Sequence, residues 1–320
     1  MPDLNEPTVS IIVLNWRRAE ETLRCLNAID RLTYANRSVV VVDNGSRDGS
    51  EELLRSARGN DPVIQSGANL GYAGGNNIGI RHALDAGAEY VWILNNDTLV
   101  EPEALTELIQ TAEHQAHAGA IATRLVELDS GLTTSDAFRF HGRTMVPVLC
   151  EGCAAGWHPA DIVGGPSLLL RADALQEVGL FDEDYFHYYE EADLMERIRR
   201  GGWDLGLVCR AVTRHSGGGS LSYASAQSQY YALRNTLLYR RKLHGEHPLR
   251  FLLRHPRVVR NALGLRRAFE CRDPRPTRAA ALAIADALRN RTGPRDLGER
   301  YHVALDGFVT FGPVDTPFVP

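Results

Sequence analysis

Apolar segments alternate with segments of helical spacing in the first part of the chain. Residues 8–14, TVSIIVL, and residues 38–43, SVVVVD, have the apolar character of strands buried on both faces. Between such runs, apolar side chains recur three and four positions apart, which predicts helices. The predicted strands are 8–14, 38–43, 62–66, 89–95 and 118–123, and the predicted helices are 18–31, 48–58, 74–87 and one whose first turn holds Pro102. This alternation predicts βαβ units and hence an α/β fold with a mostly parallel sheet covered on both faces.

The second part of the chain is less regular. Residues 124–160 show no clear periodicity and are rich in Gly, Thr, Ser and His, which predicts a long connection. The pattern then resumes with a strand and a helix within 162–180, a helix at 188–200, a strand at 203–209, and mostly helix from about 223, with breaks expected at Pro248, Pro256, Pro274 and Pro294. We therefore expect a domain over residues 1–222, with halves at about 8–123 and 124–222, and a helical extension over 223–320.

Composition and charge narrow the class of protein. The 320 residues are 44% hydrophobic and 23% charged, and no apolar run approaches the roughly 18 residues that span a bilayer. The amino end lacks the basic start and apolar stretch of a signal peptide, so we expect a cytoplasmic protein. Nucleic-acid binding is not expected, because the chain carries a net charge of −5 and no known binding module.

Basic residues gather near the carboxyl end. Residues 240–295 contain 15 basic and 4 acidic side chains, and residues 249–269 mix arginines with Leu, Phe and Val in a nearly helical rhythm. This segment could rest on an anionic membrane surface, pack as an ordinary helical pair, or form a homodimer interface.

The five cysteines do not suggest a framework of disulfides. Their number is odd and their spacing scattered, and Cys150 and Cys153 form a lone CxxC without the second pair that a zinc site needs. We expect ordinary thiols at both positions.

The usual nucleotide-binding fingerprints are missing. The first strand is followed by NWRRAE rather than by a GxGxxG loop, and neither a P-loop nor a GxSxG elbow occurs. The segment GYAGGNN at residues 71–77 matches neither motif. Its glycines either let the backbone approach a ligand or permit a turn into a helix.

Two carboxylates follow predicted buried strands. Asp43 ends the second strand, and Asp97 follows the strand at 89–95. Ligands of open α/β sheets bind beyond the carboxyl ends of the strands, so both positions are candidates for a binding site. The alternative for each aspartate alone is a helix cap.

Five separated motifs resemble the family 2 glycosyltransferases, and most closely their rhamnosyltransferase-type members. The motifs are VVVVDNGSRDGS with NLGYAGGNN, YVWILNNDTLV, the segment from GGPSLLLRADAL to YYEEADLMERIRRGGW, RHSGGGS and YYALRN. They occur in the family's order over residues 8–242. The resemblance implies a GT-A fold, a nucleoside-diphosphate sugar donor, a divalent metal and inversion at the anomeric carbon. The half at 8–123 would then bind the nucleotide, and the half at 124–222 the acceptor.

The resemblance also assigns the nucleotide and metal site. Asp43 would accept hydrogen bonds from the base or ribose, since a carboxylate is an acceptor-only group. Asp97 and His215 would bind Mn²⁺ or Mg²⁺, although Asn95 stands where the family's first aspartate would be. The nucleotide pocket would also include Asn69, Gly71 and Asn96, with Arg234 and Asn235 steadying the diphosphate.

Three acids at the start of the helix 188–200 are candidates for the general base. Glu191 stands at the family's base position with Glu in place of Asp, while Glu190 and Asp193 lie beside it. Inverting transfer needs a base opposite the leaving group, and Glu190 remains an alternative to Glu191. Acids in a first helical turn also stabilise the helix dipole without any catalysis.

These features predict a metal-assisted inverting glycosyltransferase. The resemblance favours a dTDP-rhamnose donor, then UDP-hexoses, and leaves a glycan, a lipid-linked sugar or a small molecule as acceptor. The alternatives are a non-catalytic nucleotide-sugar-binding protein on the same fold and a sugar-1-phosphate nucleotidyltransferase. A nucleotidyltransferase should carry a glycine-rich basic loop after the first strand, and NWRRAE contains no glycine.

Overall fold

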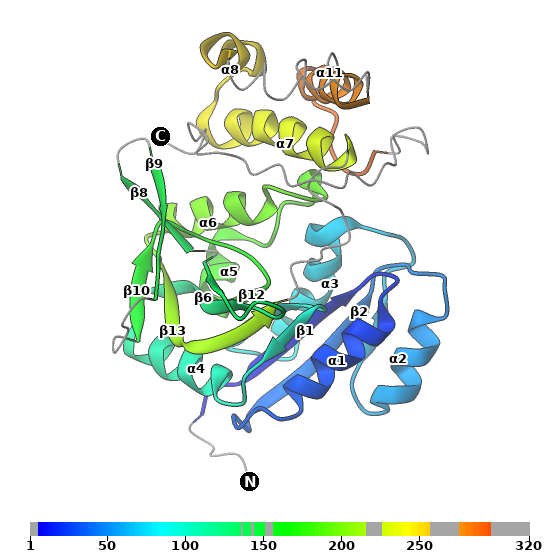
Figure 1. Cartoon of the computed structure of the whole chain (residues 1–320), viewed down its shortest axis with the longest axis vertical. Coiled ribbons are helices and arrows are strands. Elements are labelled where there is room, and N and C mark those ends of the chain that lie inside the picture. The colour runs from blue at the N-terminus through cyan, green and yellow to red at the C-terminus, as the bar shows by residue number, and fades with distance from the viewer. Residues whose placement is uncertain are drawn as a thin grey trace. The chain divides into compact units, whose positions relative to one another are not determined.

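The computed structural model describes residues 6–135, 137–141, 144–150, 156–215, 226–256 and 275–295. The chain forms two compact units (Figure 1). The first runs to Asp182 and takes in the chain again from Leu194 through the strand Asp204–His215. The second holds residues 183–193 and the carboxyl-terminal helices.

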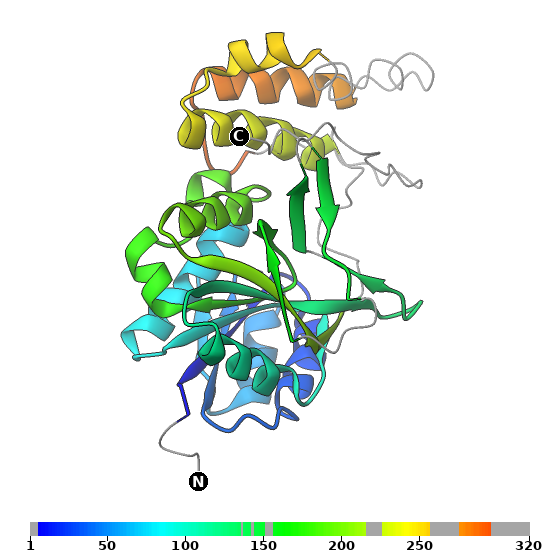
Figure 2. The ribbon, with the colours of Figure 1, turned by 90° about the vertical axis from the view of Figure 1, so that its left-hand side faces the viewer.

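One mixed sheet forms the framework of the first unit, with the strand order β10-β13-β6-β12-β4-β1-β2-β3 (Figures 1 and 2). These strands are β1 (Val9–Asn15), β2 (Arg37–Asp43), β3 (Val63–Gln65), β4 (Tyr90–Asn95), β6 (Ala118–Glu127), β10 (Trp157–Ala160), β12 (Ser167–Arg171) and β13 (Asp204–His215). The pairs β4–β1, β1–β2, β2–β3 and β6–β13 are parallel, whereas β12 runs antiparallel between β4 and β6. The mostly parallel sheet predicted from the sequence is confirmed.

Helices cover both faces of this sheet, because successive side chains of a strand point to opposite sides. Ile11 and Val13 share one core with helices α1, α2 and α4, and Ile12 shares the other core with α3, α5 and the later part of α6. The helices are α1 (Ala19–Ile29), α2 (Ser50–Arg58), α3 (Gly71–Asp85), α4 (Ala104–His114), α5 (Ala172–Val178) and α6 (Glu190–Arg200).

The glycine-rich segment 71–77 is the beginning of α3. Gly71 has a φ of 74° at the helix start. A Cβ atom at Gly75 would stand 2.5 Å from Leu14 Cδ1, and one at Gly79 would stand 2.5 Å from Ile12 Cγ2. The glycines therefore provide a turn into a helix that lies unusually close to β1.

The long connection expected over residues 124–160 is wrong for much of its length. The segment extends β6 to Glu127 and adds β7 (Thr133–Thr134), β8 (Ala137–His141), β9 (Thr144–Pro147) and β10, before β11 (Ile162–Val163). The strands β11, β8 and β9 form a separate sheet in that order. These strands are short and largely exposed, so their hydrophobic pattern is weak.

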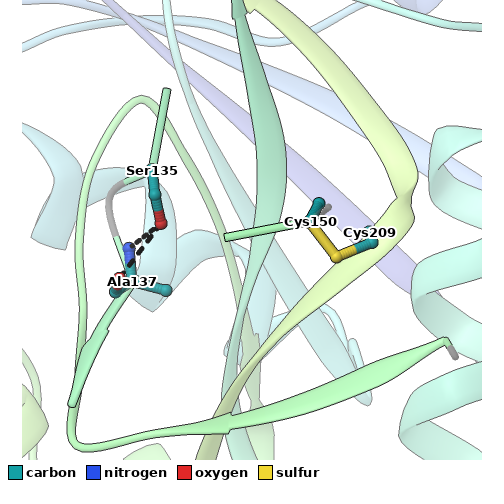
Figure 3. Close-up of a disulfide and its surroundings, with 4 residues drawn as sticks. All are labelled: Ser135, Ala137, Cys150 and Cys209. Atoms are coloured by element: carbon teal, nitrogen blue, oxygen red, sulfur yellow. Dashed lines mark hydrogen bonds between the residues drawn. A yellow bond between two sulfur atoms is a disulfide. The ribbon is translucent and has the colours of Figure 1, made fainter. Parts of the chain in front are cut away.

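A disulfide joins Cys150 to Cys209 of β13, with Cα atoms 5.6 Å apart (Figure 3). The expectation of an ordinary thiol at Cys150 is therefore wrong, and Cys153 lies outside the described residues. The bond ties the chain after β9 to the main sheet. Near it, the Ser135 hydroxyl accepts a hydrogen bond from the Ala137 amide. Cys25 is buried as a free thiol, and burial raises its pKa to about 12.

Removal of this bond is expected to destabilise the first unit. The two cysteines are 59 residues apart, and closing a loop of that size contributes about 4 kcal/mol in the chain-entropy description. Denaturant unfolding of Cys209→Ser should therefore show a loss of that order against the oxidised protein. A reductant should weaken the parent protein and leave the variant unchanged. Equal stability of the variant and the oxidised parent would contradict the assignment.

The second unit is helical. Its elements are the 3₁₀ turn η1 (Glu183–Tyr185), the start of α6, α7 (Ala226–His244), α8 (Pro248–Arg254) and α11 (Arg275–Leu288). Tyr230 and Tyr231 of α7 form a core with Phe186 and with the buried alanines of α11. In the described part of the chain, no helix has the length and apolar character needed to cross a bilayer.

Candidate active site

Asp43 ends β2 and is completely buried among polar side chains. Its Oδ1 accepts hydrogen bonds from Asn15 Nδ2 (2.6 Å) and Ser46 Oγ (2.5 Å), and its Oδ2 accepts from the Ser46 amide (3.1 Å) and Gln65 Nε2 (2.8 Å). A carboxylate offers about four lone-pair positions, so these four donors saturate it. Asp43 thus fixes the loop after β2, and its contact with a nucleotide stays a prediction.

Asn69 and Gly71 lie together at the entry to α3. Asn69 Oδ1 accepts from the Gly71 amide (2.9 Å), and Asn44 Nδ2 donates to the Gly71 carbonyl (3.0 Å) and to Asn69 Oδ1 (3.2 Å). Because Asn44 directly follows Asp43, these bonds join two of the predicted nucleotide-binding segments.

Asn96 and Asp97 form the turn between β4 and β5 (Thr98–Val100). Asn96 Nδ2 donates to Thr22 Oγ1 (3.1 Å), and Thr22 Oγ1 donates to Asn15 Oδ1 (2.8 Å). Since Asn15 also binds Asp43, hydrogen bonds run from the turn after β4 to the end of β2. The carboxyl ends of β1, β2 and β4 are therefore one polar network.

Asp97 and His215 are brought together by strand pairing. β5 runs antiparallel to β13, and its register sets Thr98 opposite His215. His215 Nε2 lies 3.2 Å from Asp97 Oδ1, and the two side chains are 22% and 7% exposed. Residues 216–220 of the RHSGGGS motif lie outside the described residues.

Asp97 and His215 offer one oxygen donor group and one nitrogen donor to a metal ion. Among the described residues, no group of three or more His, Cys, Asp or Glu side chains could hold a metal ion. A divalent ion that binds a diphosphate takes one or two carboxylates and completes its coordination with phosphate oxygens and water. One buried carboxylate beside one imidazole nitrogen fits that requirement, with the nitrogen suiting Mn²⁺.

A cleft of about 400 Å³ opens between the loops after β1 and β2. Arg17, Arg18 and Arg24 line it together with Asp48. The Arg17 amide donates to Ser46 Oγ (2.9 Å), which ties the cleft to the Asp43 network. The sequence analysis did not predict these arginines as site residues, because it compared NWRRAE only with glycine-rich nucleotide-binding loops. Two basic residues directly after a buried strand were the available signal.

Glu190, Glu191 and Asp193 begin α6 and belong to the second unit. Glu190 is 4% exposed and Asp193 2% exposed, whereas Glu191 is half-buried. Asp193 Oδ1 accepts a hydrogen bond from the Tyr185 hydroxyl (3.2 Å). Burial, and then the neighbouring charge of Glu191, raise the pKa of Glu190 to about 8. Glu190 therefore keeps its proton at neutral pH.

This raised pKa makes stability depend on pH. Between about pH 4.5 and pH 8, the unfolded chain releases a proton from Glu190 that the folded chain retains. The free energy of unfolding should then fall by about 1.4 kcal/mol per pH unit as pH rises through this window. Glu190→Gln should flatten the slope, measured as the difference between the two proteins in denaturant unfolding at pH 5 to 8. Identical slopes would show that Glu190 is not held protonated.

Arg234 and Asn235 are 1% and 0% exposed on α7. Their side chains donate to backbone carbonyls in residues 184–188. The predicted contact with a diphosphate is untested, and the observed contacts were not foreseen from the sequence.

Comparison with known proteins identifies relatives of this chain. The model of the family described as "Glycosyl transferase family 2" matches residues 10–172. The low-salt glycan biosynthesis hexosyltransferase Agl10 of Haloferax volcanii is 30% identical over 210 residues, which are 64% of this chain and 65% of that protein. The chain thus spans just under two thirds of that relative. The N-acetylglucosaminyl-diphospho-decaprenol L-rhamnosyltransferase of Mycobacterium tuberculosis is 26% identical over 80% of this chain and 92% of its own length.

Solved structures show the same fold. The mannosyltransferase PcManGT from Pyrobaculum calidifontis, in complex with GDP-Man and Mn²⁺, has a TM-score of 0.54 at 16% identity and covers 90% of this chain and 77% of its own. GalNAc-T7 with UDP, GalNAc and Mn²⁺ has a TM-score of 0.57 at 14% identity and covers 74% of this chain and 48% of its own. The GT-A-type fold expected from the sequence is confirmed. The chain belongs to glycosyl transferase family 2 and is a glycosyltransferase with rhamnosyl- and hexosyltransferase relatives.

Proposed function

We propose that the protein transfers rhamnose or another hexose from a nucleoside-diphosphate sugar to an acceptor hydroxyl, with inversion. The pairing of Asp97 with His215 at 3.2 Å carries this proposal, because it sets two metal-type donors beside the polar network of Asp43. A hexosyltransferase and a rhamnosyltransferase among the relatives support transfer of a hexose and favour rhamnose. The donor in this proposal is dTDP-rhamnose, with a UDP-hexose as the alternative.

Asp97 and His215 would hold the divalent ion, Mn²⁺ or Mg²⁺. Two of the structural neighbours were solved with Mn²⁺. When bound, such an ion offsets the negative charge that develops on the leaving diphosphate. The residues around it have a separate task. Asn69, Gly71 and Asn96 would line the donor pocket, while Asp43 holds the loop after β2 in place through its bonds to Ser46.

Glu191 is the general base in this proposal. Its half-buried position lets it meet an acceptor hydroxyl, whereas Glu190 keeps its own proton at neutral pH. Glu191 would take the hydroxyl proton as the acceptor oxygen attacks the anomeric carbon and the diphosphate departs. A single displacement of this kind inverts the configuration. Residues 1–222 would form the catalytic domain, with an acceptor half at 124–222, and residues 223–320 an extension.

The acceptor in this proposal is a lipid-linked glycan, and α8 supplies a membrane contact. Leu249 and Leu253 are 51% and 75% exposed and lie one helical turn apart, next to Arg250 and Arg254. Exposed apolar side chains flanked by arginines suit an anionic lipid surface. Residues 257–269 of the basic segment lie outside the described residues.

The membrane contact predicts that Leu249→Glu/Leu253→Glu will lose sedimentation with phosphatidylglycerol vesicles. Glutamates remove the apolar contact and add charge of the wrong sign. Leu132→Glu, at a leucine 65% exposed in the first unit, is the matched control and should sediment like the parent. Unchanged sedimentation of the double variant would contradict the contact.

Donor turnover tests the proposed function as a whole. The protein is incubated with dTDP-rhamnose and with UDP-hexoses in the presence of Mn²⁺, without acceptor. A glycosyltransferase should hydrolyse its own donor slowly and release a nucleoside diphosphate. A nucleotidyltransferase should leave the nucleotide sugar intact and instead release pyrophosphate when it is given a nucleoside triphosphate and a sugar 1-phosphate. Failure of every nucleotide sugar to bind or react would favour the non-catalytic alternative.

A further inference from the structure

The four residues before α6 have an unusual backbone. Phe186, Tyr188 and Tyr189 have φ values of 65°, 66° and 76°. Side chains of this size rarely occupy the left-handed region, so each such residue is strained unless its surroundings hold it there. Glu190 and Glu191 follow at once, so this segment sets where the first turn of α6 begins.

Asn235 contacts this segment from α7. Its Nδ2 atom lies within 2.8–2.9 Å of the carbonyl oxygens of Tyr185, His187 and Tyr188. These carbonyls come from the segment that contains the left-handed residues Phe186 and Tyr188. The side chain of Asn235 therefore matches the left-handed conformation specifically.

Arg234 holds the same segment from one residue earlier. Its Nη2 donates to the carbonyls of Tyr185 (2.9 Å) and Asp184 (3.3 Å), its Nη1 to Gly293 (2.6 Å), and its Nε to Asn235 Oδ1 (2.8 Å). The guanidinium carbon also lies 4.9 Å from the ring centre of Tyr231. The hydrogen bond from Arg234 Nε to Asn235 Oδ1 orients the Asn235 amide so that its nitrogen faces the carbonyls.

The pair sits on a rigid support. Both side chains are almost fully buried, and α7 packs against α11 through Tyr230, Tyr231 and the alanines of α11. Buried hydrogen-bond donors that lost these carbonyls would be left unsatisfied, which is costly away from water. The contacts therefore offset the strain of the left-handed segment.

We propose that Arg234 and Asn235 are positioning residues that set the first turn of α6, and with it the carboxylate of Glu191. This inference rests on the proposed role of Glu191 as the general base. In this inference, Arg234 and Asn235 do not contact the diphosphate directly. They contact the segment of the chain that leads to the proposed base. The expected signature is a loss of turnover without a loss of donor binding.

The test compares Asn235→Ala with Tyr230→Phe in the full chain. Tyr230→Phe removes the buried hydroxyl that donates to Asp286 (2.8 Å) and also interacts with the Arg234 side chain. It keeps the ring beside Arg234 and leaves the bonds of Asn235 to the carbonyls of 185–188 in place. Asn235→Ala should lower kcat by about 10²-fold, because a misplacement of about 1 Å has that effect, with the KM for donor unchanged within about twofold. Its amides at 185–191 should exchange hydrogen faster, while those of β1 and β4 keep the parent rate. Tyr230→Phe should retain parent kcat.

Three results would overturn the proposal: parent kcat in Asn235→Ala, unchanged exchange at 185–191, or a weakened affinity for dTDP or UDP that accounts for the lost turnover. Should Asn235→Ala fail to fold, Arg234→Lys keeps the charge and loses the fork of donors, and the same measurements apply. Glu191→Gln separates the two levels of inference. Parent turnover in Glu191→Gln would refute the proposed base, whereas an inactive Glu191→Gln beside a fully active Asn235→Ala would refute the positioning role alone.

Discussion

Glu191→Gln is expected to lower kcat by about 10²–10⁴-fold, the contribution of a well-placed general base. The change removes the proton acceptor and keeps the size and most of the polarity of the side chain. Donor binding should persist, because the proposed donor pocket consists of residues at the ends of β1, β2 and β4. Turnover of donor and acceptor, together with nucleotide binding by titration calorimetry, measures both effects.

The neighbouring carboxyl is the matched control. Glu190→Gln mimics the protonated form that burial imposes at neutral pH, so it should retain most of the parent turnover. A collapse of kcat in Glu190→Gln with activity retained in Glu191→Gln would move the base to Glu190. The pH profile would then rise near pH 8 in the parent, where Glu190 releases its proton.

Asp97→Ala is expected to abolish stabilisation of the protein by nucleoside diphosphates in the presence of Mn²⁺. A ligand at 100 times its dissociation constant adds about 2.7 kcal/mol to the stability of a folded protein. The variant removes the one carboxylate of the proposed metal pair. The metal site then keeps a single donor, the imidazole nitrogen of His215. Thermal unfolding of both proteins with dTDP, UDP and GDP, with Mn²⁺ or with EDTA, measures the effect and names the preferred base.

Asp85→Ala at the end of α3 is the control, since this aspartate is exposed and remote in sequence from both ligands. It should keep the full nucleotide-dependent shift. A shift that survives in Asp97→Ala, or one that EDTA does not reduce in the parent, would argue against a metal held by Asp97.

Local patterns were sufficient for the sheet and for the position of the candidate residues. The apolar run before Asp43 and the one before Asp97 required strands, and the parallel topology then placed both aspartates at one edge. The polar partners of Asp43 could be located only in part. Ser46 bonds it within the local turn, but Asn15 and Gln65 reach it through strand pairing. No periodicity in sequence encodes those contacts.

The features that the sequence did not predict also depend on contacts between distant parts of the chain or on local structure with a weak pattern. Cys150 and Cys209 meet because β13 passes the chain after β9, which their spacing does not reveal. The strands between residues 124 and 160 are short, and an alternation such as that of AFRFH in β8 covers too few residues to stand out from the polar sequence around it. The contacts of Asn235 depend on a left-handed stretch of three aromatic residues, where sequence propensity points to another backbone conformation.

The pairing of β5 with β13 has a consequence for the order in which the protein becomes functional during synthesis. Asp97 leaves the ribosome with the first half of the sheet, but His215 ends the last strand to join it. At about 5–20 residues per second, the nascent chain spends several seconds with β1, β2 and β4 complete and only one of the two proposed metal ligands made. A truncated product that stops at β12 would retain the network of Asp43 and lack half of the metal pair.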